Sequence, residues 1–329
     1  MSLKVGLIGC ANTALKNFLP SIEFSDAKLE FIASRSSTKA KDWAERFQST
    51  KFGNYEEVIE SDVDMVYIPL PIGLHEEWII KAAKSGKHIL CEKSSTTSFE
   101  SAKRIIDVCR ENNVRILEAF SYKFHPQHEH VKELIKNEIG IVQNFVGRFG
   151  FAPPPIENIR WNKKLGGGIL NDAACYPISA CRMLLEQEPL SVFAELFFDK
   201  EFEVDTKANI FLKFFDGKTA FISSSFNSYY QSRYEVLGDK GKISTNRAYA
   251  VPKNYVVSTY FEKDDKVFEK KFVDVNQFGL MLKEFCDVIT KKKENSFDFE
   301  NDLLNQAKMM EAIRISSEQS REVFLSEFN

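Results

Sequence analysis

Lys4-Val-Gly-Leu-Ile-Gly-Cys-Ala-Asn-Thr-Ala14 is the stretch of sequence that decides the fold. Its apolar run, Lys4–Ile8, has the length and composition of a buried strand and ends at Gly9. Apolar residues then recur at helical spacing: Leu15, Phe18, Leu19 and Ile22. Strand, tight turn and helix in this order are the context of a dinucleotide-binding fingerprint. Gly9 can make the turn, and the N-terminus of the helix can hold a pyrophosphate through its N–H groups and its dipole.

We expect the whole turn to contact the dinucleotide, through Gly9, Cys10, Ala11, Asn12 and Thr13. The fingerprint has three glycines, and Ala11 and Ala14 stand in place of the second and third. A methyl group at position 11 would crowd the approach of a phosphate to the backbone.

The second predicted strand, Leu29–Ala33, ends in Ser34-Arg35-Ser36. An NAD site places Asp or Glu at this strand end to hold the ribose 2′-hydroxyl, and here there is none. Arg35 can stack on the adenine or pair with a 2′-phosphate, and the serine hydroxyls can donate to the same group. The sequence therefore favours NADP(H), with NAD(H) as the alternative. An exposed loop arginine is the other interpretation of Arg35.

Two further pairs of strand and helix follow, and then a last strand. The strands are predicted at Asp64–Pro69, His88–Cys91 and Val114–Glu118, and the helices at Trp78–Ala83 and Phe99–Arg110. Alternation of this kind predicts a parallel, doubly wound sheet whose ligands bind at the carboxyl ends of the strands.

Two groups of residues fall at those strand ends and are expected to contact the cofactor. Pro69 and Leu70 follow one strand with His75 nearby, and Glu92 and Lys93 follow the next. A lysine facing a low-dielectric crevice can donate a proton or hold a substrate oxygen. A structural ion pair between Glu92 and Lys93 is the alternative.

A second glycine-rich stretch, Leu165–Pro177, contains three consecutive glycines followed by Asp172 and Tyr176. Glycines allow close backbone approach or positive φ. If the segment after them is helical, Asp172 and Tyr176 lie one turn apart on one face. We expect both to be catalytic and to bind substrate. A capping Asp and a packing Tyr are the alternative. Arg160 either anchors a substrate oxygen or phosphate, or pairs with a surface acid.

Composition excludes several classes of protein. The chain has 329 residues, 43% of them hydrophobic and 28% charged, and a net charge of −3. This balance gives no basic field for nucleic acid or an anionic membrane. Its six cysteines are scattered, with no Cys-x-x-Cys pair, which fits a reducing compartment. No apolar run has the length of a membrane span, and the N-terminus does not resemble a signal peptide. We expect a cytoplasmic protein.

The second part of the chain has strands in series. They are predicted at Ile141–Phe149, Val192–Phe198, Ala208–Phe215, Thr219–Phe226, Tyr230–Leu237, Tyr255–Phe261 and Lys266–Val273. Asp216-Gly217 is a hairpin signal, so the sheet is expected to be largely antiparallel, with helices on one face. Apolar residues occupy both alternating positions of several strands, and we hypothesise that the open face forms a homodimer or homotetramer. Phe278–Ile289 and Leu303–Ile315 are predicted amphipathic helices, and Lys291–Glu294 is expected to be the solvated end of the first.

One histidine cluster raises the question of a metal. His125, His128 and His130 lie close together with Glu129, at a loose ligand spacing. No cysteine completes a tetrahedral set, so we predict no metal site. The Tyr122–Gln127 stretch is expected to form an interdomain hinge lining the cleft, where Tyr122 would contact substrate.

Five motifs between residues 5 and 177 resemble the glucose–fructose oxidoreductase/inositol dehydrogenase/MocA (Gfo/Idh/MocA) family of NAD(P)-dependent oxidoreductases, and the resemblance runs through essentially the whole chain. They are Val5–Ala14, Val66–Pro71 with Leu74-His75, Gly86–Lys93, Ala119–Gln127 and Gly166–Pro177. Within this family the chain is most similar to the branch that contains dimeric dihydrodiol dehydrogenase, glucose–fructose oxidoreductase, and sugar ketoreductases or pentose dehydrogenases.

This resemblance implies roles for three residues. Lys93 would lie beside the nicotinamide and substrate, Tyr176 would be the general acid/base, and Asp172 would orient the substrate. Ser94 replaces a proline of the family motif, and Ile72 replaces an asparagine near the cofactor.

The sequence and the resemblance together predict a Rossmann domain over 1–120 and an α+β domain over 121–329 that binds substrate and oligomerises. The predicted activity is NADP(H)-dependent interconversion of a secondary alcohol and a ketone on a sugar-like substrate. A non-catalytic NADP-binding regulator is one alternative. The other is an enzyme whose tightly bound cofactor drives net isomerisation or glycoside cleavage. The sequence does not name the sugar or the direction.

Overall fold

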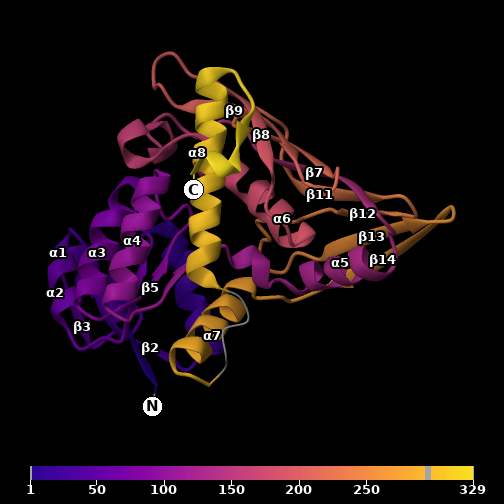
Figure 1. The fold of residues 1–329 in the computed structure, drawn as a ribbon. Helices are drawn as coiled ribbons and strands as arrows, with labels where there is room; N and C mark the ends of the chain where they lie inside the picture. Colours follow the sequence, from indigo (N-terminus) through magenta and orange to yellow (C-terminus); the bar gives the residue numbers. More distant parts are fainter. Residues whose placement is uncertain (1, 293–297, 329) are drawn as a thin grey trace. The chain divides into compact units, whose positions relative to one another are not determined.

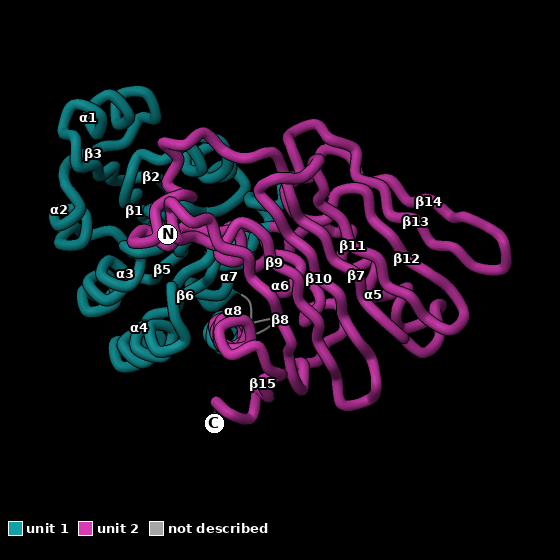
Figure 2. The backbone as a smooth tube through the Cα atoms, turned by 90° about the horizontal axis from the view of Figure 1, so that it is seen from above, with its two compact units in different colours: residues 1–121, 276–304 teal, residues 122–275, 305–329 magenta. Residues whose placement is uncertain are grey.

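The computed structural model describes residues 2–292 and 298–328. It divides into two compact units, coloured separately in Figure 2. Unit 1 comprises 1–121 and 276–304, and unit 2 comprises 122–275 and 305–329. Two contiguous pieces, 1–120 and 121–329, were expected from the sequence. In the structure the segment 276–304 belongs with the N-terminal unit instead.

Unit 1 is built on a parallel sheet of six strands in the order β3-β2-β1-β4-β5-β6. The strands are β1 (Leu3–Ile8), β2 (Ala27–Ala33), β3 (Lys51–Gly53), β4 (Met65–Ile68), β5 (His88–Cys91) and β6 (Ile116–Glu118). This is the strand order of the doubly wound dinucleotide-binding fold. β1, β4 and β5 are almost wholly buried, as expected for strands covered on both faces.

The helices of unit 1 are α1 (Ser37–Arg46), α2 (Tyr55–Glu60), α3 (His75–Lys84), α4 (Phe99–Glu111) and α7 (Gln277–Ile289). Short 3₁₀ turns lie at η3 (Ile72–Leu74) and η4 (Ser121–Phe124). The sequence predicted α3, α4 and α7 to within a few residues. It missed β3, α1 and α2, which are short or weakly apolar. Of the predicted solvated end at Lys291–Glu294, the last two residues lie outside the described residues.

The helix after the Gly9 turn is irregular. It runs as a π-helical turn, η1 (Ala14–Phe18), followed by a 3₁₀ helix, η2 (Leu19–Phe24). Pro20 stands in the first turn of η2 and has no N–H to donate to the preceding turn. The predicted helix is therefore present, but its hydrogen bonding is not that of a regular α-helix.

Unit 2 contains a nine-stranded sheet in the order β14-β13-β12-β11-β7-β10-β9-β8-β15. Its strands are β7 (Val142–Gly150), β8 (Ser191–Phe198), β9 (Asp205–Lys213), β10 (Thr219–Ser225), β11 (Gln231–Gly238), β12 (Lys242–Thr245), β13 (Val257–Lys263), β14 (Lys266–Phe272) and β15 (Val323–Phe324). All neighbours are antiparallel except β7 and β10. This confirms the largely antiparallel sheet expected from the sequence, although β12 and β15 were missed.

Helices cover one face of this sheet (Figure 1). They are α5 (Pro126–Asn137) and α6 (Cys175–Leu185), with short turns at η5 (Ile159–Trp161), η6 (Lys163–Leu165), η7 (Leu170–Ala174) and η8 (Leu325–Phe328). The long helix α8 (Phe299–Gln319) is shared between the units by residue number, and its end bonds to β8 through Ser316 and Ser317. Within the described ranges, no helix is both long and apolar enough to span a membrane.

Candidate functional site

The carboxyl edge of the parallel sheet in unit 1 is where the predicted cofactor residues meet. Gly9 follows β1 with a φ of +113° and donates its N–H to the carbonyl of Ala33 at 2.9 Å. A Cβ at this position would lie 2.7 Å from Cδ2 of Leu70, which follows β4. The turn therefore favours glycine because of its positive φ, and a Cβ would in addition displace the flexible end of the Leu70 side chain. Ala14, in place of the third glycine, is fully buried against the sheet.

The end of β2 presents a cation and hydroxyl groups and no acid. Ser36 caps α1 by accepting the N–H of Lys39 at 3.3 Å, and its own N–H bonds to the Ser34 hydroxyl oxygen. Arg35 is exposed and interacts with Tyr55, where burial raises the pKa of the phenol and the guanidinium opposes this rise. Exposed positive charge beside two hydroxyls suits a 2′-phosphate.

A buried carboxylate joins β5 to the Gly9 turn. Glu92 accepts the Tyr67 hydroxyl at 2.6 Å and the Thr13 hydroxyl at 3.3 Å. Burial raises the pKa of Glu92, while the Tyr67 bond and the charge of Lys93 oppose the rise. Glu92 therefore has partners besides Lys93, and it fixes Thr13 within the turn expected to hold the pyrophosphate.

His75 lies inside unit 1 with no exposed surface. Its Nε2 is 2.7 Å from the carbonyl oxygen of Leu70, and its Nδ1 is 3.0 Å from that of Ser94. Burial lowers the pKa of His75 to about 4, so the ring is neutral near pH 7 and donates one of these bonds. His75 thus ties together the loops that follow β4 and β5, and its ring nitrogens face backbone carbonyls.

The remaining turn residues flank this edge. Cys10 is buried, and burial raises the pKa of its thiol to about 11, so it stays protonated. Asn12 is exposed, and Ala11 and Pro69 lie at the ends of β1 and β4. The structure therefore brings the predicted cofactor residues of unit 1 to one edge of one sheet.

In unit 2, Arg160 and Asp172 form an ion pair, with Nε and Oδ2 2.6 Å apart. Their side chains are 37% and 19% exposed, so the pair is partly shielded from water. The two residues predicted separately to contact substrate are thus partners of each other.

Tyr176 lies in the first turn of α6, directly after the π-helical turn η7. Its ring centroid is 5.3 Å from that of Phe149, 5.7 Å from Tyr122 and 5.8 Å from Tyr249. Aromatic rings from β7, η4 and the loop after β12 therefore fix the orientation of the phenol. Pro177 follows within the same first turn of α6, where a proline is tolerated.

Sequence reasoning missed several residues of this region. Tyr249 and Phe149 pack on Tyr176 from distant segments, and Asp205 bonds to the N–H of Leu170 at the start of η7. Nothing in their local sequence distinguishes them from packing residues. Asp205 lies three residues before the predicted strand Ala208–Phe215, and only the structure makes it the first residue of β9.

The three clustered histidines have separate roles. His128 is within 2.9 Å of the Tyr234 hydroxyl and 3.1 Å of the Ala248 carbonyl. His125 caps α5 by accepting the N–H of Gln127, and His130 lies near Glu133. Burial lowers the pKa of His128 to about 3 and that of His125 to about 4. Among the described residues no group of three or more His, Cys, Asp or Glu side chains is placed to hold a metal.

The strand order of unit 1 and the groups at its carboxyl edge define a dinucleotide-binding protein. Two family models match the chain. Residues 3–120 match the oxidoreductase family with an NAD-binding Rossmann fold, and residues 128–244 match the Gfo/Idh/MocA C-terminal domain. The chain belongs to the Gfo/Idh/MocA family of oxidoreductases, which confirms the resemblance found in its sequence.

Similar proteins act on sugars. A dTDP-3,4-didehydro-2,6-dideoxy-α-D-glucose 3-reductase from Actinomadura kijaniata is 33% identical over 315 residues, covering 95% of each chain. An NADP(+)-dependent D-xylose 1-dehydrogenase from Haloferax volcanii is 32% identical, covering 86% of this chain and 88% of that one. The solved structure of the A. kijaniata 3-ketoreductase with NADP and TDP-benzene superposes with a TM-score of 0.91, covering 96% and 98% of the two chains.

Proposed function

We propose that this protein is an NADP(H)-dependent oxidoreductase that interconverts a secondary alcohol and a ketone on a sugar or sugar derivative. The observation that carries the proposal is the edge of the unit 1 sheet. There the Gly9 turn, the Ser34-Arg35-Ser36 strand end and the Glu92-Lys93 strand end lie together. The NADP-dependent relatives, similar over most of the chain, support the same cofactor and substrate class.

The residues present fit the dinucleotide. The positive φ of Gly9 opens the backbone, and no side chain caps the first turn of η1 among the described residues. In this proposal Gly9–Thr13 hold the pyrophosphate, Ser34 and Arg35 hold the 2′-phosphate, and Pro69, Leu70 and Lys93 flank the nicotinamide. Glu92 and His75 shape the strand ends that carry these groups. When bound, the nicotinamide supplies or accepts the hydride.

We assign the proton transfer to Tyr176. In the direction of reduction its phenol gives a proton to the ketone oxygen, and in the direction of oxidation the phenolate takes it back. Lys93 stabilises negative charge on that oxygen. Asp172, held by Arg160, accepts a hydrogen bond from a neighbouring hydroxyl of the sugar. Solved structures of the A. kijaniata ketoreductase include a tyrosine variant and lysine variants, which singles out the same two residue types.

NADPH consumption by the purified protein tests the proposal against a panel of aldoses, ketoses and keto-sugar nucleotides. We expect turnover of at least one ketone, faster with NADPH than with NADH. Tight NADPH binding without turnover of any sugar would instead identify a regulator. Cofactor that copurifies and is never consumed would identify net isomerisation or glycoside cleavage.

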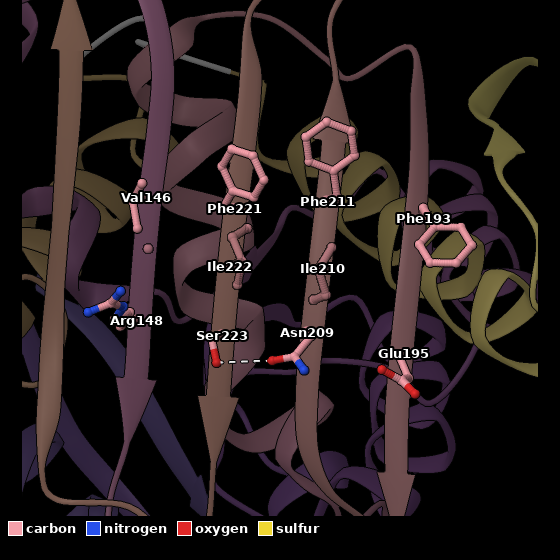
Figure 3. A pocket seen from close by; sticks show the side chains of 11 residues that line it. Val146, Arg148, Phe193, Glu195, Asn209, Ile210, Phe211, Phe221, Ile222 and Ser223 are labelled. Carbon is pink, nitrogen blue, oxygen red and sulfur yellow. Dashed lines mark hydrogen bonds between the residues drawn. The ribbon is translucent and has the colours of Figure 1, made fainter.

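We also propose that a second copy of this chain covers the open face of the nine-stranded sheet. Figure 3 shows two rows of side chains across β7, β10, β9 and β8. One row is apolar: Val146, Phe221, Phe211 and Phe193. The other is polar: Arg148, Ser223, Asn209 and Glu195. Phe193 and Phe221 are 48% and 50% exposed, which is costly for a face left in water.

The polar row is complementary to itself. It begins with the cation of Arg148 and ends with the anion of Glu195. A two-fold axis that lies between the two facing sheets and runs parallel to the strands therefore pairs each with the other. Arg148 also lies opposite Arg233 on β11, a like-charge pair that a facing carboxylate would relieve. Within the described ranges neither Arg148 nor Glu195 has a salt bridge of its own.

Light scattering after size exclusion tests this interface. We expect a dimer or tetramer at micromolar concentration, a shift towards monomer in Arg148→Glu and in Glu195→Arg, and recovery in the double exchange. Lys253→Glu, an exposed loop position, is the matched control and should leave the assembly unchanged. A strictly monomeric wild type overturns the proposal. We also propose a cytoplasmic location, because the six cysteines are buried and form no disulfide among the described residues; cell fractionation tests it.

A further inference from the structure

The helix that carries Asp172 and Tyr176 begins against a buried carboxylate from a distant strand. Its own N-cap residue, Ile169, contributes no side-chain cap. Instead Oδ2 of Asp205, the first residue of β9, accepts the N–H of Leu170 at 2.6 Å. Asp205 is only 8% exposed, so this charge-assisted bond is shielded from water.

The glycines before the helix make room for this carboxylate. Gly168 has a φ of +110°, and a Cβ there would lie 2.2 Å from Oδ1 of Asp205. A Cβ on Gly167 would lie 2.4 Å from the carbonyl oxygen of Arg160. The glycine run thus approaches other parts of this chain closely, and the absence of a side chain at Gly168 leaves the space that the Asp205 carboxylate occupies.

The same helix is held from its flank by α8. Gln306 donates to the carbonyl of Cys175 at 3.0 Å, and Arg314 donates to Oδ1 of Asn171 at 2.7 Å. Both contacts immediately precede a residue expected to take part in the reaction, Asp172 or Tyr176. Between them runs the π-helical turn η7, which is wider than an α-helical turn and in which the N–H of Cys175 bonds to the carbonyl of Leu170, five residues earlier.

We propose that Asp205 is a positioning residue: it fixes the first turn of this helix and thereby the placement of Asp172 and Tyr176. The inference rests on the proposed function. A carboxylate is the right group because the N-terminus of a helix carries unpaired N–H groups and partial positive charge. Burial raises the pKa of Asp205, and the N–H groups of Leu170 and Ile169 and the charge of Arg314 oppose that rise.

Asp205→Asn tests the proposal, because it keeps the size of the side chain and removes the charge and one acceptor. We expect kcat to fall about tenfold through misplacement of the reacting groups, with the KM for NADPH unchanged. Glu322→Gln is the matched control: Glu322 bonds to Ser191 and Lys213 elsewhere in unit 2, so its loss should change stability and not kcat.

A double-mutant cycle separates positioning from a general loss of structure. If Asp205 acts through Tyr176, Asp205→Asn should lower the residual rate of Tyr176→Phe by less than about twofold. An equal loss in both backgrounds would overturn the proposal. Should Asp205→Asn fail to fold, Arg314→Met removes a neighbouring contact of the same turn and should show the same dependence on Tyr176 with a smaller loss.

Hydrogen exchange keeps this inference separate from the proposed function. In the peptide covering 166–176, exchange should be faster in Asp205→Asn than in the wild type, and unchanged in Glu322→Gln. This readout needs no turnover, so it decides the point even if the wild type reduces none of the sugars. Unchanged exchange in Asp205→Asn would show that the carboxylate does not hold the turn.

Discussion

Two glycine turns in this molecule open helices in similar ways and are used in opposite ways. In unit 1 Gly9 precedes a helix that begins with a π turn, and in unit 2 Gly168 precedes another. Both glycines have a φ near +110°. At Gly168 the first N–H groups are taken by the protein's own Asp205. At Gly9 no side chain caps the helix within the described residues, which suits a phosphate from outside.

The difference between the two turns shows how a glycine turn before a helix can be assigned as a ligand site or as a structural contact. A helix N-terminus attracts an anion in either case, and what distinguishes a ligand site from a structural joint is whether the chain supplies that anion itself. An internal anion holds the helix rigid, which suits a helix that presents catalytic side chains. An N-terminus without one leaves its N–H groups to a cofactor.

We call the Gly168 turn closed, because Asp205 occupies its N–H groups, and the Gly9 turn open. Tyr176→Phe gives the largest expected effect and tests whether the helix after the closed turn carries the proton-transferring group. Loss of the proton-transferring hydroxyl should lower kcat by about 10²–10⁴-fold, while NADPH affinity, set in unit 1, should not change. Rates and NADPH titrations measure both. Tyr255→Phe, which removes a hydroxyl elsewhere in unit 2, serves as control. Turnover within about twofold of the wild type would remove Tyr176 from the mechanism.

Exchanging each glycine for alanine tests the comparison itself. Either substitution forces a side chain into a backbone conformation that costs about 1–3 kcal/mol. Gly9→Ala should weaken NADPH binding, and its Cβ meets only the flexible end of Leu70. Gly168→Ala meets the Asp205 carboxylate, so it should lower the melting temperature and kcat and leave NADPH affinity intact.

The two variants are each other's controls. Identical changes in NADPH affinity would show that both turns serve the same purpose, and the distinction between an open and a closed turn would be lost. A normal kcat in a folded Gly168→Ala protein would likewise contradict the role given to its contact with Asp205.

Arg35→Ala tests whether the cofactor expected at the open Gly9 turn is NADPH, since Arg35 is expected to bind its 2′-phosphate. Removing a guanidinium from a phosphate should cost about 10–100-fold in kcat/KM with NADPH and almost nothing with NADH. Arg46→Ala removes an exposed charge at the far end of α1 and should change neither value. Equal losses with both cofactors would mean that Arg35 does not contact the 2′-phosphate.

The sequence was sufficient for elements with a strong local pattern. The strand at His88–Cys91 has the predicted bounds, and α4 differs by one residue, because apolar runs and helical periodicity are local properties. It was insufficient for β12 and β15, which are four and two residues long and depend on their neighbours in the sheet. It also missed α5, where His125 and Pro126 begin a helix within an expected hinge.

The residues of the candidate site also fall into those that a local pattern predicts and those that depend on the tertiary fold. Gly9, Arg35, Lys93 and Tyr176 were predicted as site residues because each stands in a motif. The partners that hold them were not: Asp205 lies 35 residues from Leu170, and Gln306 lies 131 residues from Cys175. Such contacts follow from the tertiary fold, and no spacing rule along the chain reports them. Arg160 was expected to hold a substrate oxygen or phosphate or to pair with a surface acid, and its pairing with the partly buried Asp172 was not foreseen.

The smallest expected effect is the dependence of stability on pH, which we expect to come in part from the buried His75. Burial lowers the pKa of His75 to about 4, against 6.5 in an unfolded chain. Between these values the unfolded state binds a proton that the folded state does not. Stability from the neutral ring is therefore fully present above pH 6.5 and is lost as the pH falls towards 4. At pH 5 the loss is about 2 kcal/mol.

Thermal melts of His75→Gln and the wild type at pH 7 and pH 5 measure this contribution. The glutamine amide can still donate to the Leu70 carbonyl, so the variant should fold at pH 7 and lose less stability on acidification than the wild type. Burial also lowers the pKa of His130, but its side chain is more exposed, so His130→Gln should stay closer to the wild-type dependence than His75→Gln. If His75→Gln retains the full wild-type loss, the ring is not kept neutral by burial. The bonds from His75 to the loops after β4 and β5 would then belong to an imidazolium, which can donate to both carbonyls at once.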